Sequence, residues 1–362
     1  MSDISYGFTL ACLMGLVVSV LIIVIGRPLA IKVGLVDEPN SRKLHNGSVP
    51  LIGGVAVFVG TIAPLALLFD LSDKIFYLFA TGSFILFMGL IDDHRGLGVR
   101  IRIFVQVMAS VIMIKSTGLY VENLGDLFGW GDIHLGQWGM AFTIVAVIGL
   151  VNAYNMIDGI DGLLGAMVII ALVGAVLFQV NSGRILLIEH IAVLVAALVP
   201  YLCVNLGFFS KRKIFIGDAG SMFLGYLLAW FFIYLSQSPV DAIKPVSVLW
   251  CLAIPVVDTL VVMSRRILKK KSIFAADREH LHHVFQLAKV SDRKALLIIN
   301  LLALSLLLLG LVLVSYGEQY SFVVFFIFFC IYAFSILHSW RLHKGLKQFK
   351  FVRGRKKRAN KL

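Results

Sequence analysis

Acidic side chains interrupt a strongly apolar chain at three places, and they are the first candidates for chemistry. Asp92 and Asp93 end a long apolar stretch. Asp158 and Asp161 lie in "NMIDGIDG", and Asp218 lies in "FIGDAGS". Carboxylates grouped at the mouth of a low-dielectric helix bundle would repel one another and be driven towards protonation unless a cation offset their charge. The sequence therefore predicts a divalent cation among them.

The donor atoms at these positions favour Mg²⁺ or Mn²⁺ over zinc, because they are oxygens without a Cys or His cluster among them. Mg²⁺ is typically held by one or two protein oxygens while phosphates complete its shell, so a phosphate-bearing substrate is implied. Each motif also has a simpler interpretation. Asp92 and Asp93 could form a solvated cap after a span, Asp158 and Asp161 part of a tight turn, and Asp218 a helix N-cap.

A fourth polar group, "REHLHH", lies in the largest predicted aqueous loop. A helix over Glu279–Ala288, capped by Asp277, would place His280 and His283 away from one apolar stripe, which consists of Leu281, Val284, Phe285 and Ala288. We expect an interfacial helix laid against the membrane. Its histidines are expected to hydrogen-bond to phosphate or sugar, since the spacing lacks the Cys or Glu-x-x-His framework of a zinc site.

These residues must be positioned by membrane-spanning helices. Of 362 residues, 59% are hydrophobic and 15% charged, and the mean hydropathy is +0.93. Soluble proteins carry about 25% charged residues, so the composition indicates an all-α polytopic membrane helix bundle. Apolar runs long enough to cross a core of ~30 Å predict about eleven transmembrane helices. They cover approximately residues 4–26, 50–69, 75–91, 101–119, 138–156, 163–180, 186–206, 215–235, 246–263, 295–316 and 322–340.

Basic residues predict the orientation, because Lys and Arg in short loops stay on the cytoplasmic side. With the N-terminus outside, the outer loops hold only Lys74, Lys115, Arg184 and Lys244 of the 33 Lys and Arg residues. We therefore predict an N-out, C-in topology. In this topology all four polar groups reach the inner face, although only basic residues were used to assign it. The predicted site is cytoplasmic.

The remainder of the chain adds few candidates for chemistry. We expect one integral membrane domain over residues 1–362, with a cytoplasmic loop at 264–294 and a basic cytoplasmic tail at 341–362. The net charge of +13 is concentrated in inner loops and the tail, where it favours membrane lipids and no nucleic acid. The cysteines lack paired spacing, so neither a disulfide framework nor a metal site is expected. Asp258, near the middle of its apolar run, should pair with a polar group in the bundle interior.

The order of these motifs resembles that of the polyprenyl-phosphate N-acetylhexosamine-1-phosphate transferases. Asp-Asp, Asn-x-x-Asp-Gly-x-Asp-Gly, Phe-x-Gly-Asp-x-Gly-Ser and a His-rich inner loop follow one another from residue 92 to residue 283. "VPLIGG" at 49–54 and "HLHH" at 280–283 are similar to the branch of the family that uses UDP-N-acetylglucosamine. At the position of "VPLIGG", the phospho-N-acetylmuramoyl-pentapeptide transferases instead have T-P-T-M-G-G.

The resemblance implies roles for the acidic residues. Asp218 and Asn155 match the family's Mg²⁺ ligands. Asp92 or Asp93 matches the pair proposed to deprotonate or position the acceptor phosphate, and Asp158 is grouped with that pair as a catalytic candidate.

The resemblance also implies contacts with the substrate. Asp161 matches the uracil contact, and Arg102 matches a diphosphate contact. The His-rich loop and the basic first inner loop supply the other predicted substrate-binding residues: His280, His282, His283 and Lys43.

The reaction that this resemblance implies takes UDP-N-acetylglucosamine and undecaprenyl phosphate and releases UMP. It would start a lipid-linked glycan such as O antigen or enterobacterial common antigen at the bacterial inner membrane. Another UDP-sugar is the nearest alternative. A membrane transporter is the alternative of a different class, although transport sites usually lie at the bilayer midplane between repeated halves. The sequence leaves open whether the chain forms a homodimer.

Overall fold

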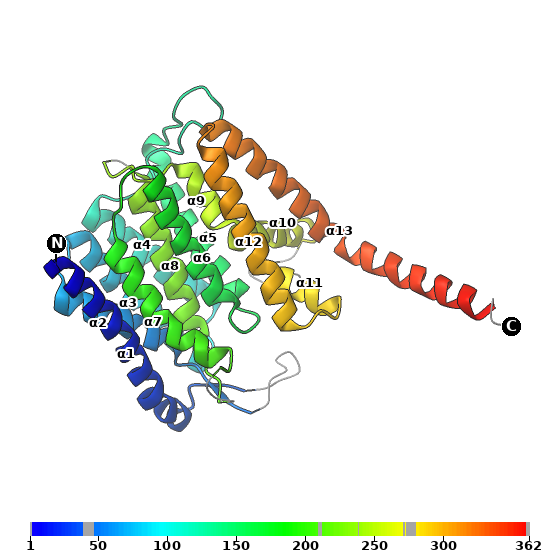
Figure 1. The fold of residues 1–362 in the computed structure, drawn as a ribbon, viewed down its shortest axis with the longest axis horizontal. Coiled ribbons are helices and arrows are strands. Elements are labelled where there is room, and N and C mark those ends of the chain that lie inside the picture. The colour runs from blue at the N-terminus through cyan, green and yellow to red at the C-terminus, as the bar shows by residue number, and fades with distance from the viewer. Residues whose placement is uncertain are drawn as a thin grey trace.

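The chain folds into a bundle of helices that a long C-terminal helix extends to one side (Figure 1). The computed structural model describes residues 2–38, 47–208, 212–237, 239–270, 272 and 280–359, with side chains described between residues 6 and 338. The strands β1 (Val36–Asp37) and β2 (Val49–Pro50) pair antiparallel, and a 3-10 turn, η1 (Gly136–Trp138), precedes α5. The predicted all-α class is confirmed by the helices, which are α1 (Ser2–Val33), α2 (Gly53–Leu68), α3 (Asp73–Arg95), α4 (Val99–Thr117), α5 (Gly139–Ile157), α6 (Leu163–Asn181), α7 (Ile188–Asn205), α8 (Gly217–Ser236), α9 (Pro245–Cys251), α10 (Ala253–Leu268), α11 (Leu281–Leu287), α12 (Asp292–Val314) and α13 (Glu318–Ala359).

Among the described residues, 8 helices are long and apolar enough to cross a membrane: α1, α3, α5, α6, α7, α8, α12 and α13. The chain is therefore a multi-pass membrane protein. α9 and α10 pass the same test together but bend by 83°, so the segment 246–263 is a broken helix where we expected a continuous one. α2 has only 16 residues, and α4 carries three basic residues. All the predicted segments are helical, while the count of spans and the N-out, C-in orientation stay predictions.

α8 lies at the centre of the bundle (Figure 1). Of its membrane-spanning window, 94% is buried, and it packs against α2, α3 and α5. The closest approach is to α3, where a Cβ added to Gly89 would collide with the backbone of Ala219. On the α2 side, a Cβ on Gly54 would lie 2.5 Å from Gly220 Cα. These contacts place the C-terminal part of α3 and the start of α2 against the first turn of α8.

The segment that leads into α8 is fastened to the start of α2. The Phe215 N–H donates to the Pro50 carbonyl at 2.9 Å, and the Gly53 N–H donates to the Phe215 carbonyl at 2.9 Å. The Gly54 N–H donates to the Ile216 carbonyl at 3.0 Å. The first N–H groups of a helix lack partners within it, so the backbone before α8 satisfies the start of α2.

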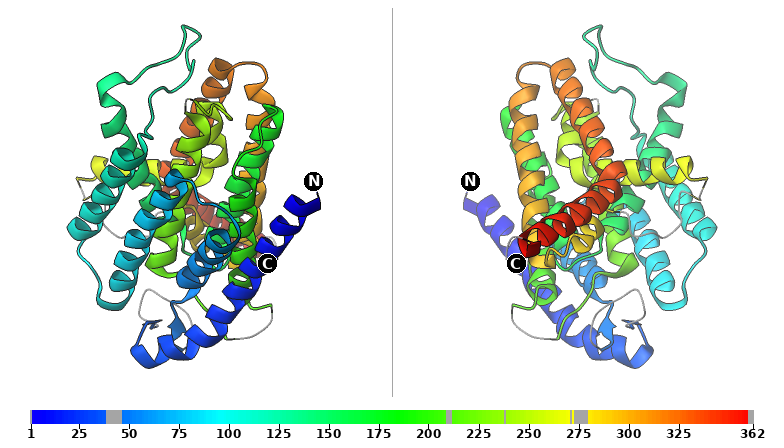
Figure 2. Two further views of the ribbon diagram at one scale, coloured as in Figure 1. Left: turned by 90° about the vertical axis from the view of Figure 1, so that its left-hand side faces the viewer. Right: turned by 90° about the vertical axis from the view of Figure 1, so that its right-hand side faces the viewer.

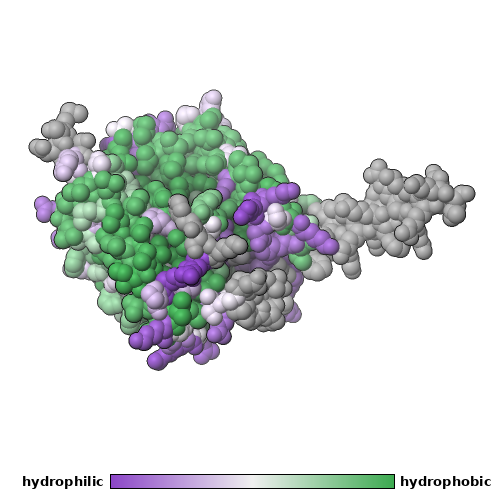
Figure 3. All heavy atoms as spheres, turned by 60° about the horizontal axis from the view of Figure 1, so that its bottom comes forward, coloured by the Kyte–Doolittle hydropathy of each residue, from purple (hydrophilic) through white to green (hydrophobic). Residues whose placement is uncertain are grey.

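The outer surface has the apolar character of a membrane protein. α1 runs obliquely along the outside of the bundle (Figure 2), and only 22% of its membrane-spanning window is buried. In Figure 3, hydrophobic side chains cover much of the flank and hydrophilic ones gather towards the lower end of Figure 1. A hydrophobic flank with a polar end is the surface expected of a bundle placed across a bilayer.

Candidate active site

Asp93, in the last turn of α3, holds the first turn of α8. Its carboxylate accepts hydrogen bonds from the N–H groups of Asp218 (2.8 Å) and Ala219 (3.1 Å). A carboxylate there satisfies unpaired helix N–H groups and meets the positive end of the helix dipole. Gly217 permits this approach, because its φ is +72° and a Cβ there would collide with the Asp93 carboxylate. Asp93 therefore caps α8, and the alternative in which Asp218 is the N-cap is wrong.

Asp92 faces the interior and is only 8% exposed. Its carboxylate accepts hydrogen bonds from the Leu97 N–H at 2.6 Å and from Arg102 Nη1 at 3.0 Å. The same guanidinium nitrogen lies 4.0 Å from Asp218 Oδ2. Asp92 is thus a buried partner of Arg102, and its interpretation as a solvated loop cap is wrong.

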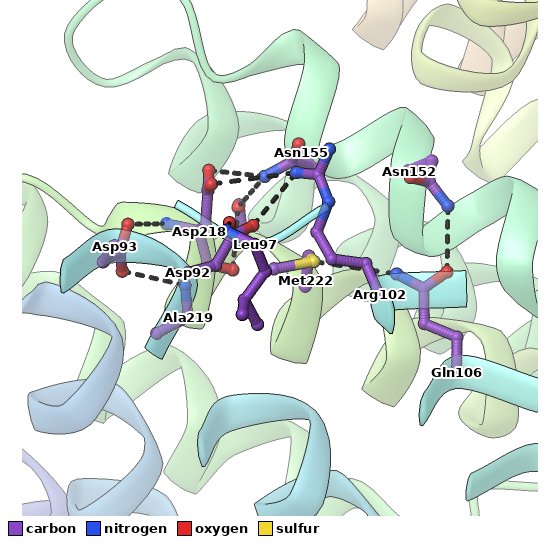
Figure 4. A network of polar contacts seen from close by, with 11 residues as sticks. Asp92, Asp93, Leu97, Arg102, Gln106, Asn152, Asn155, Asp218, Ala219 and Met222 are labelled. Carbon is purple, nitrogen blue, oxygen red and sulfur yellow. Dashed lines mark hydrogen bonds and ion pairs between the residues drawn. The ribbon is translucent and has the colours of Figure 1, made fainter. Parts of the chain in front are cut away.

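Asn155, in the last turn of α5, brings another helix to this cluster. Its Nδ2 donates to Asp218 Oδ1 at 2.8 Å and to Ser221 Oγ at 3.0 Å. The Asp218 side chain keeps 42% of its surface exposed, whereas that of Asp92 keeps 5%. Four helices, α3, α4, α5 and α8, thereby bring together the residues shown in Figure 4, which include Asp92, Asp93, Arg102, Asn155 and Asp218.

A divalent cation could take its protein ligands from Asp218 and Asn155. Carboxylate and amide oxygens are the donors that Mg²⁺ prefers. Asn155 now presents its Nδ2 to Asp218, so binding would require the amide to turn its oxygen towards the ion. Within the described part of the chain, no group of three or more His, Cys, Asp or Glu residues could hold a metal. These residues fit an ion that substrate phosphates help to coordinate, and they do not fit a zinc site.

Asp158 and Asp161 lie in the short loop between α5 and α6. Asp158 is the exposed residue that ends α5, one helical turn beyond Asn155. Asp161 forms an ion pair with Lys213. The loop closes at Gly162, whose φ is +79° and whose N–H donates to Asn205 Oδ1 at 2.7 Å. The predicted tight turn is therefore present, and it follows directly from the turn of α5 that carries Asn155, whose side chain contacts Asp218.

The short helix α11 covers this loop. His282 is only 2% exposed, and its imidazole lies so close to Gly159 that a Cβ there would collide with it. Its Nδ1 has no hydrogen-bond partner among the described residues. Burial, followed by the nearby His283 and His280, lowers the pKa of His282 to about 3. His282 is thus a neutral imidazole that packs on the loop carrying Asp158 and Asp161.

The two other predicted histidines have different surroundings. His280 is 4% exposed, and its Nδ1 lies 2.7 Å from Asp258 Oδ2. It faces the interior, where we expected it to project away from the apolar stripe. His283 is partly exposed, with its Nδ1 3.0 Å from Gln286 Oε1. α11 begins at Leu281, and the expected start at Glu279 and the cap at Asp277 lie outside the described residues.

Two further points concern a predicted residue outside the described part of the chain and a polar layer that was not predicted. Lys43, the predicted substrate contact in the first inner loop, lies outside the described residues. A buried polar layer next to the site was not predicted from the sequence. In it, Asn152 Nδ2 donates to Gln106 Oε1 at 3.0 Å and Gln106 Nε2 donates to the Met222 sulfur at 3.6 Å (Figure 4). Helical spacing could have indicated it, because Gln106 follows Arg102 by four residues on α4.

Comparison with known proteins gives one consistent result. The sequence profile of glycosyl transferase family 4 matches residues 75–236. The undecaprenyl-phosphate alpha-N-acetylglucosaminyl 1-phosphate transferase of Yersinia pestis is 36% identical over 347 residues, which cover 93% of this chain and 93% of that protein. The proteins of the same name from Escherichia coli K12 and Haemophilus influenzae are each 35% identical, over 90% and 94% of this chain and 89% and 97% of their own length.

Proposed function

Because this chain belongs to glycosyl transferase family 4, among the polyprenyl-phosphate N-acetylhexosamine-1-phosphate transferases, we propose that it transfers N-acetylglucosamine 1-phosphate to undecaprenyl phosphate. The donor is UDP-N-acetylglucosamine and the other product is UMP. The observation that carries the proposal is the convergence of Asp92, Asp93, Asn155 and Arg102 on Asp218 and the first turn of α8, at one end of a membrane bundle. Relatives named for this activity match more than nine tenths of the chain.

The place of the site suits two substrates of different solubility. A nucleotide sugar is water-soluble, whereas the phosphate of a lipid lies at the depth of the headgroups. Residues at the end of a membrane bundle can meet both. We assign this end to the cytoplasmic face of a bacterial inner membrane, where the product would start a lipid-linked glycan such as O antigen or enterobacterial common antigen.

The nucleophile needs little activation. A phosphate monoester has its second pKa at about 6, so the lipid phosphate is mostly a dianion at neutral pH. One of its oxygens attacks the β-phosphorus of the nucleotide sugar, a new O–P bond forms, and the bond from that phosphorus to the oxygen of the UMP phosphate breaks. No strong general base is required, in agreement with the occupied oxygens of Asp92 and Asp93.

The side chains of the site therefore bind the substrates and hold one another in position. Asp92 orients the Arg102 guanidinium, which is placed to contact the diphosphate. Asp93 fixes the first turn of α8 and with it Asp218. Asp218 and Asn155 would hold Mg²⁺, which when bound neutralises charge on the diphosphate and the departing UMP. Mn²⁺ suits the same oxygen donors.

Most of the remaining substrate contacts are assigned to residues in or next to the α5–α6 loop, which α11 covers. Asp161, oriented by Lys213, is the proposed uracil contact, and Asp158 stands between it and the metal ligand Asn155. His282 and His283 lie on the α11 side of this loop, where the sugar and its phosphate would pass. Lys43 is the proposed basic contact from the first inner loop.

A labelled substrate tests the reaction. The purified full-length protein in detergent would receive undecaprenyl phosphate, Mg²⁺ and UDP-N-acetylglucosamine labelled on the β-phosphate. We expect the label in the lipid fraction with equimolar UMP, loss of turnover with EDTA, and recovery with added Mg²⁺ or Mn²⁺. Release of UDP would mean sugar transfer without its phosphate, and lipid labelling only from a different UDP-sugar would reassign the donor. No UMP at all would refute the proposal.

A further inference from the structure

Asp258 is a buried acid for which the proposed reaction has no use. It lies in α10, the longer arm of the broken α9–α10 pair, and is only 2% exposed. A carboxylate in a membrane interior costs several kcal/mol unless donors surround it. An apolar residue would fill the same space without that cost. Packing alone therefore does not account for a carboxylate at position 258.

Three donors from two other helices surround this carboxylate. Asp258 Oδ2 pairs with His280 Nδ1 at 2.7 Å. Asp258 Oδ1 accepts hydrogen bonds from the Leu281 N–H at 3.0 Å and from the Tyr332 hydroxyl at 2.8 Å. One side chain thus joins α10, the start of α11 and α13. α11 has no side-chain cap from its own N-cap residue, so Asp258 supplies the acceptor from a distant part of the chain.

The contact continues from this carboxylate to the acidic loop. The His280 and His282 rings are parallel within 3°, with centroids 6.0 Å apart. The His282 imidazole in turn lies against Gly159, between Asp158 and Asp161 in sequence. A continuous series of contacts therefore leads from Asp258 in the bundle interior to the loop that flanks the proposed active site.

We propose that Asp258 is a positioning residue for the nucleotide-sugar side of the site. By fixing His280 and the first turn of α11, it holds His282 on Gly159 and keeps Asp158 and Asp161 in place. The effect on catalysis rests on the proposed function above, whereas the effect on the order of the loop does not. Asp258 itself touches no substrate.

Hydrogen exchange tests the positioning role without reference to activity. The full-length protein in detergent would be compared with the variants Asp258→Asn, Asp258→Leu and Tyr332→Phe. Asp70→Asn is the matched control, since Asp70 is exposed in the connection between α2 and α3. Peptides covering 157–163 and 281–288 would be followed, with 219–236 of α8 as the internal reference.

We expect Asp258→Asn to speed amide exchange in both peptides on the order of tenfold, because hydrogen bonds to a charged acceptor are stronger than those to a neutral amide. Tyr332→Phe removes one donor and should give a smaller change in the same peptides, even if Asp258→Asn folds poorly. Asp258→Leu should resemble Asp258→Asn, and α8 and Asp70→Asn should not change. Wild-type exchange in 157–163 for both Asp258 variants would overturn the proposal. A uniform increase across α8 would also overturn it, because that result indicates a purely structural role.

Kinetics provide the second measurement. We expect Asp258→Asn to raise KM for UDP-N-acetylglucosamine about tenfold and to change kcat less, while KM for undecaprenyl phosphate stays within a factor of two. The variant His280→Gln should give a similar change, and the double variant should be no worse than the more affected single one. Additive effects would overturn the link through His280. If the wild type transfers nothing to lipid, the proposed function fails, but the exchange result still decides the role of Asp258.

Discussion

Asp218 differs from the two carboxylates of α3 in what occupies its oxygens. Asp92 and Asp93 accept hydrogen bonds from Arg102, Leu97 and the first N–H groups of α8. Asp218 receives one from Asn155 and keeps 42% of its side-chain surface exposed. It is therefore the member of this trio with an oxygen available to the proposed metal ion.

This difference predicts an order of effects on turnover. Asp218→Asn should lower kcat about 10²–10³-fold, the range observed when one electrostatic contact to a transition state is removed. Asp92→Asn and Asp93→Asn should lower kcat less, because they alter positioning. Asp93→Asn should also lower Tm, since its amide would place a donor against the N–H groups that start α8.

The measurement is steady-state kinetics with a thermal unfolding scan for each variant. Ser305→Ala, at an exposed site on α12, is the control. Equal losses of kcat for the three variants, or a larger loss for Asp93→Asn at unchanged Tm, would contradict the assigned roles.

The buried His282 predicts a pH dependence of stability. Its pKa is lowered from 6.5 to about 3, so the unfolded state binds a proton that the folded state does not throughout this window. Stability therefore rises with pH between about 3 and 6.5 and is lost as pH falls through that range, by at most about 1.4 kcal/mol per pH unit for this proton. His282→Gln should flatten this part of the Tm profile in detergent. An unchanged slope would show that the histidine is solvated.

For individual residues, the sequence predicted which side chains gather at the site, but it did not predict the hydrogen bonds that each one makes. The acidic residues stood out because charge is rare in apolar runs. The partners of Asp93 are backbone N–H groups 125 residues away, and every residue has such a group, so composition cannot identify them. Asp258 was expected to find a polar partner, and the structure confirms three.

The contact between α3 and α8 sets the geometry of the site. Gly89 and Ala219 allow the two backbones to touch, and Asp93 lies one turn beyond Gly89 on the same face of α3. Residues four apart on a helix share a face, so the distance between Asp93 and the start of α8 depends on this small-residue contact.

Gly89→Ala should therefore separate α3 from α8. A Cβ there would overlap the Ala219 backbone, and overpacking of this kind costs about 1–3 kcal/mol. We expect a lower Tm and a loss of turnover exceeding tenfold. Gly149→Ala on α5 is the matched control, because nothing lies within 4 Å of the added Cβ, and replacing a helical Gly by Ala stabilises by roughly 0.5–1 kcal/mol. Equal behaviour of the two variants would refute this account.

The length of the apolar runs predicted the helices correctly, except that it did not predict the break between α9 and α10. The run 246–263 reads as one span, yet α9 ends at Cys251 and α10 begins at Ala253. Pro255 explains the break, since it has no N–H to donate to the Cys251 carbonyl four residues earlier. The start of α2 moved to Gly53 for another reason, because Pro50 pairs with Phe215, a partner that no local pattern reveals.

The molecule as a whole has two distinct ends. α6 begins beside the acidic loop at Leu163, ends at Asn181 and contains 19 residues, a length of about 28 Å and close to the thickness of a hydrocarbon core. The α3–α4 connection lies at the end with the carboxylates. The α4–α5 connection, which includes Trp130 at 91% exposure, lies at the other.

The predicted N-out, C-in topology can be tested on these two connections. In a background without the four native cysteines, Trp130→Cys should react with a membrane-impermeant maleimide added to right-side-out vesicles. Arg95→Cys, at the exposed end of α3, should react only after the vesicles are opened. The reverse pattern would invert the assignment and place the proposed site outside the cell. Labelling of both residues in sealed vesicles would indicate leakage and would be checked with a cytosolic marker.

The long separation between Asp93 and Asp218 has a consequence for biosynthesis. Asp218 follows Asp93 by 125 positions, which a ribosome needs roughly 6–25 s to add at about 5–20 residues per second. During that interval Asp93 has been synthesised, but the turn of α8 that it caps has not. Tyr332, which anchors α11 through Asp258, emerges later still. A chain that stops before α8 therefore cannot assemble the cluster around Asp218, and one that stops before Tyr332 lacks a donor to Asp258.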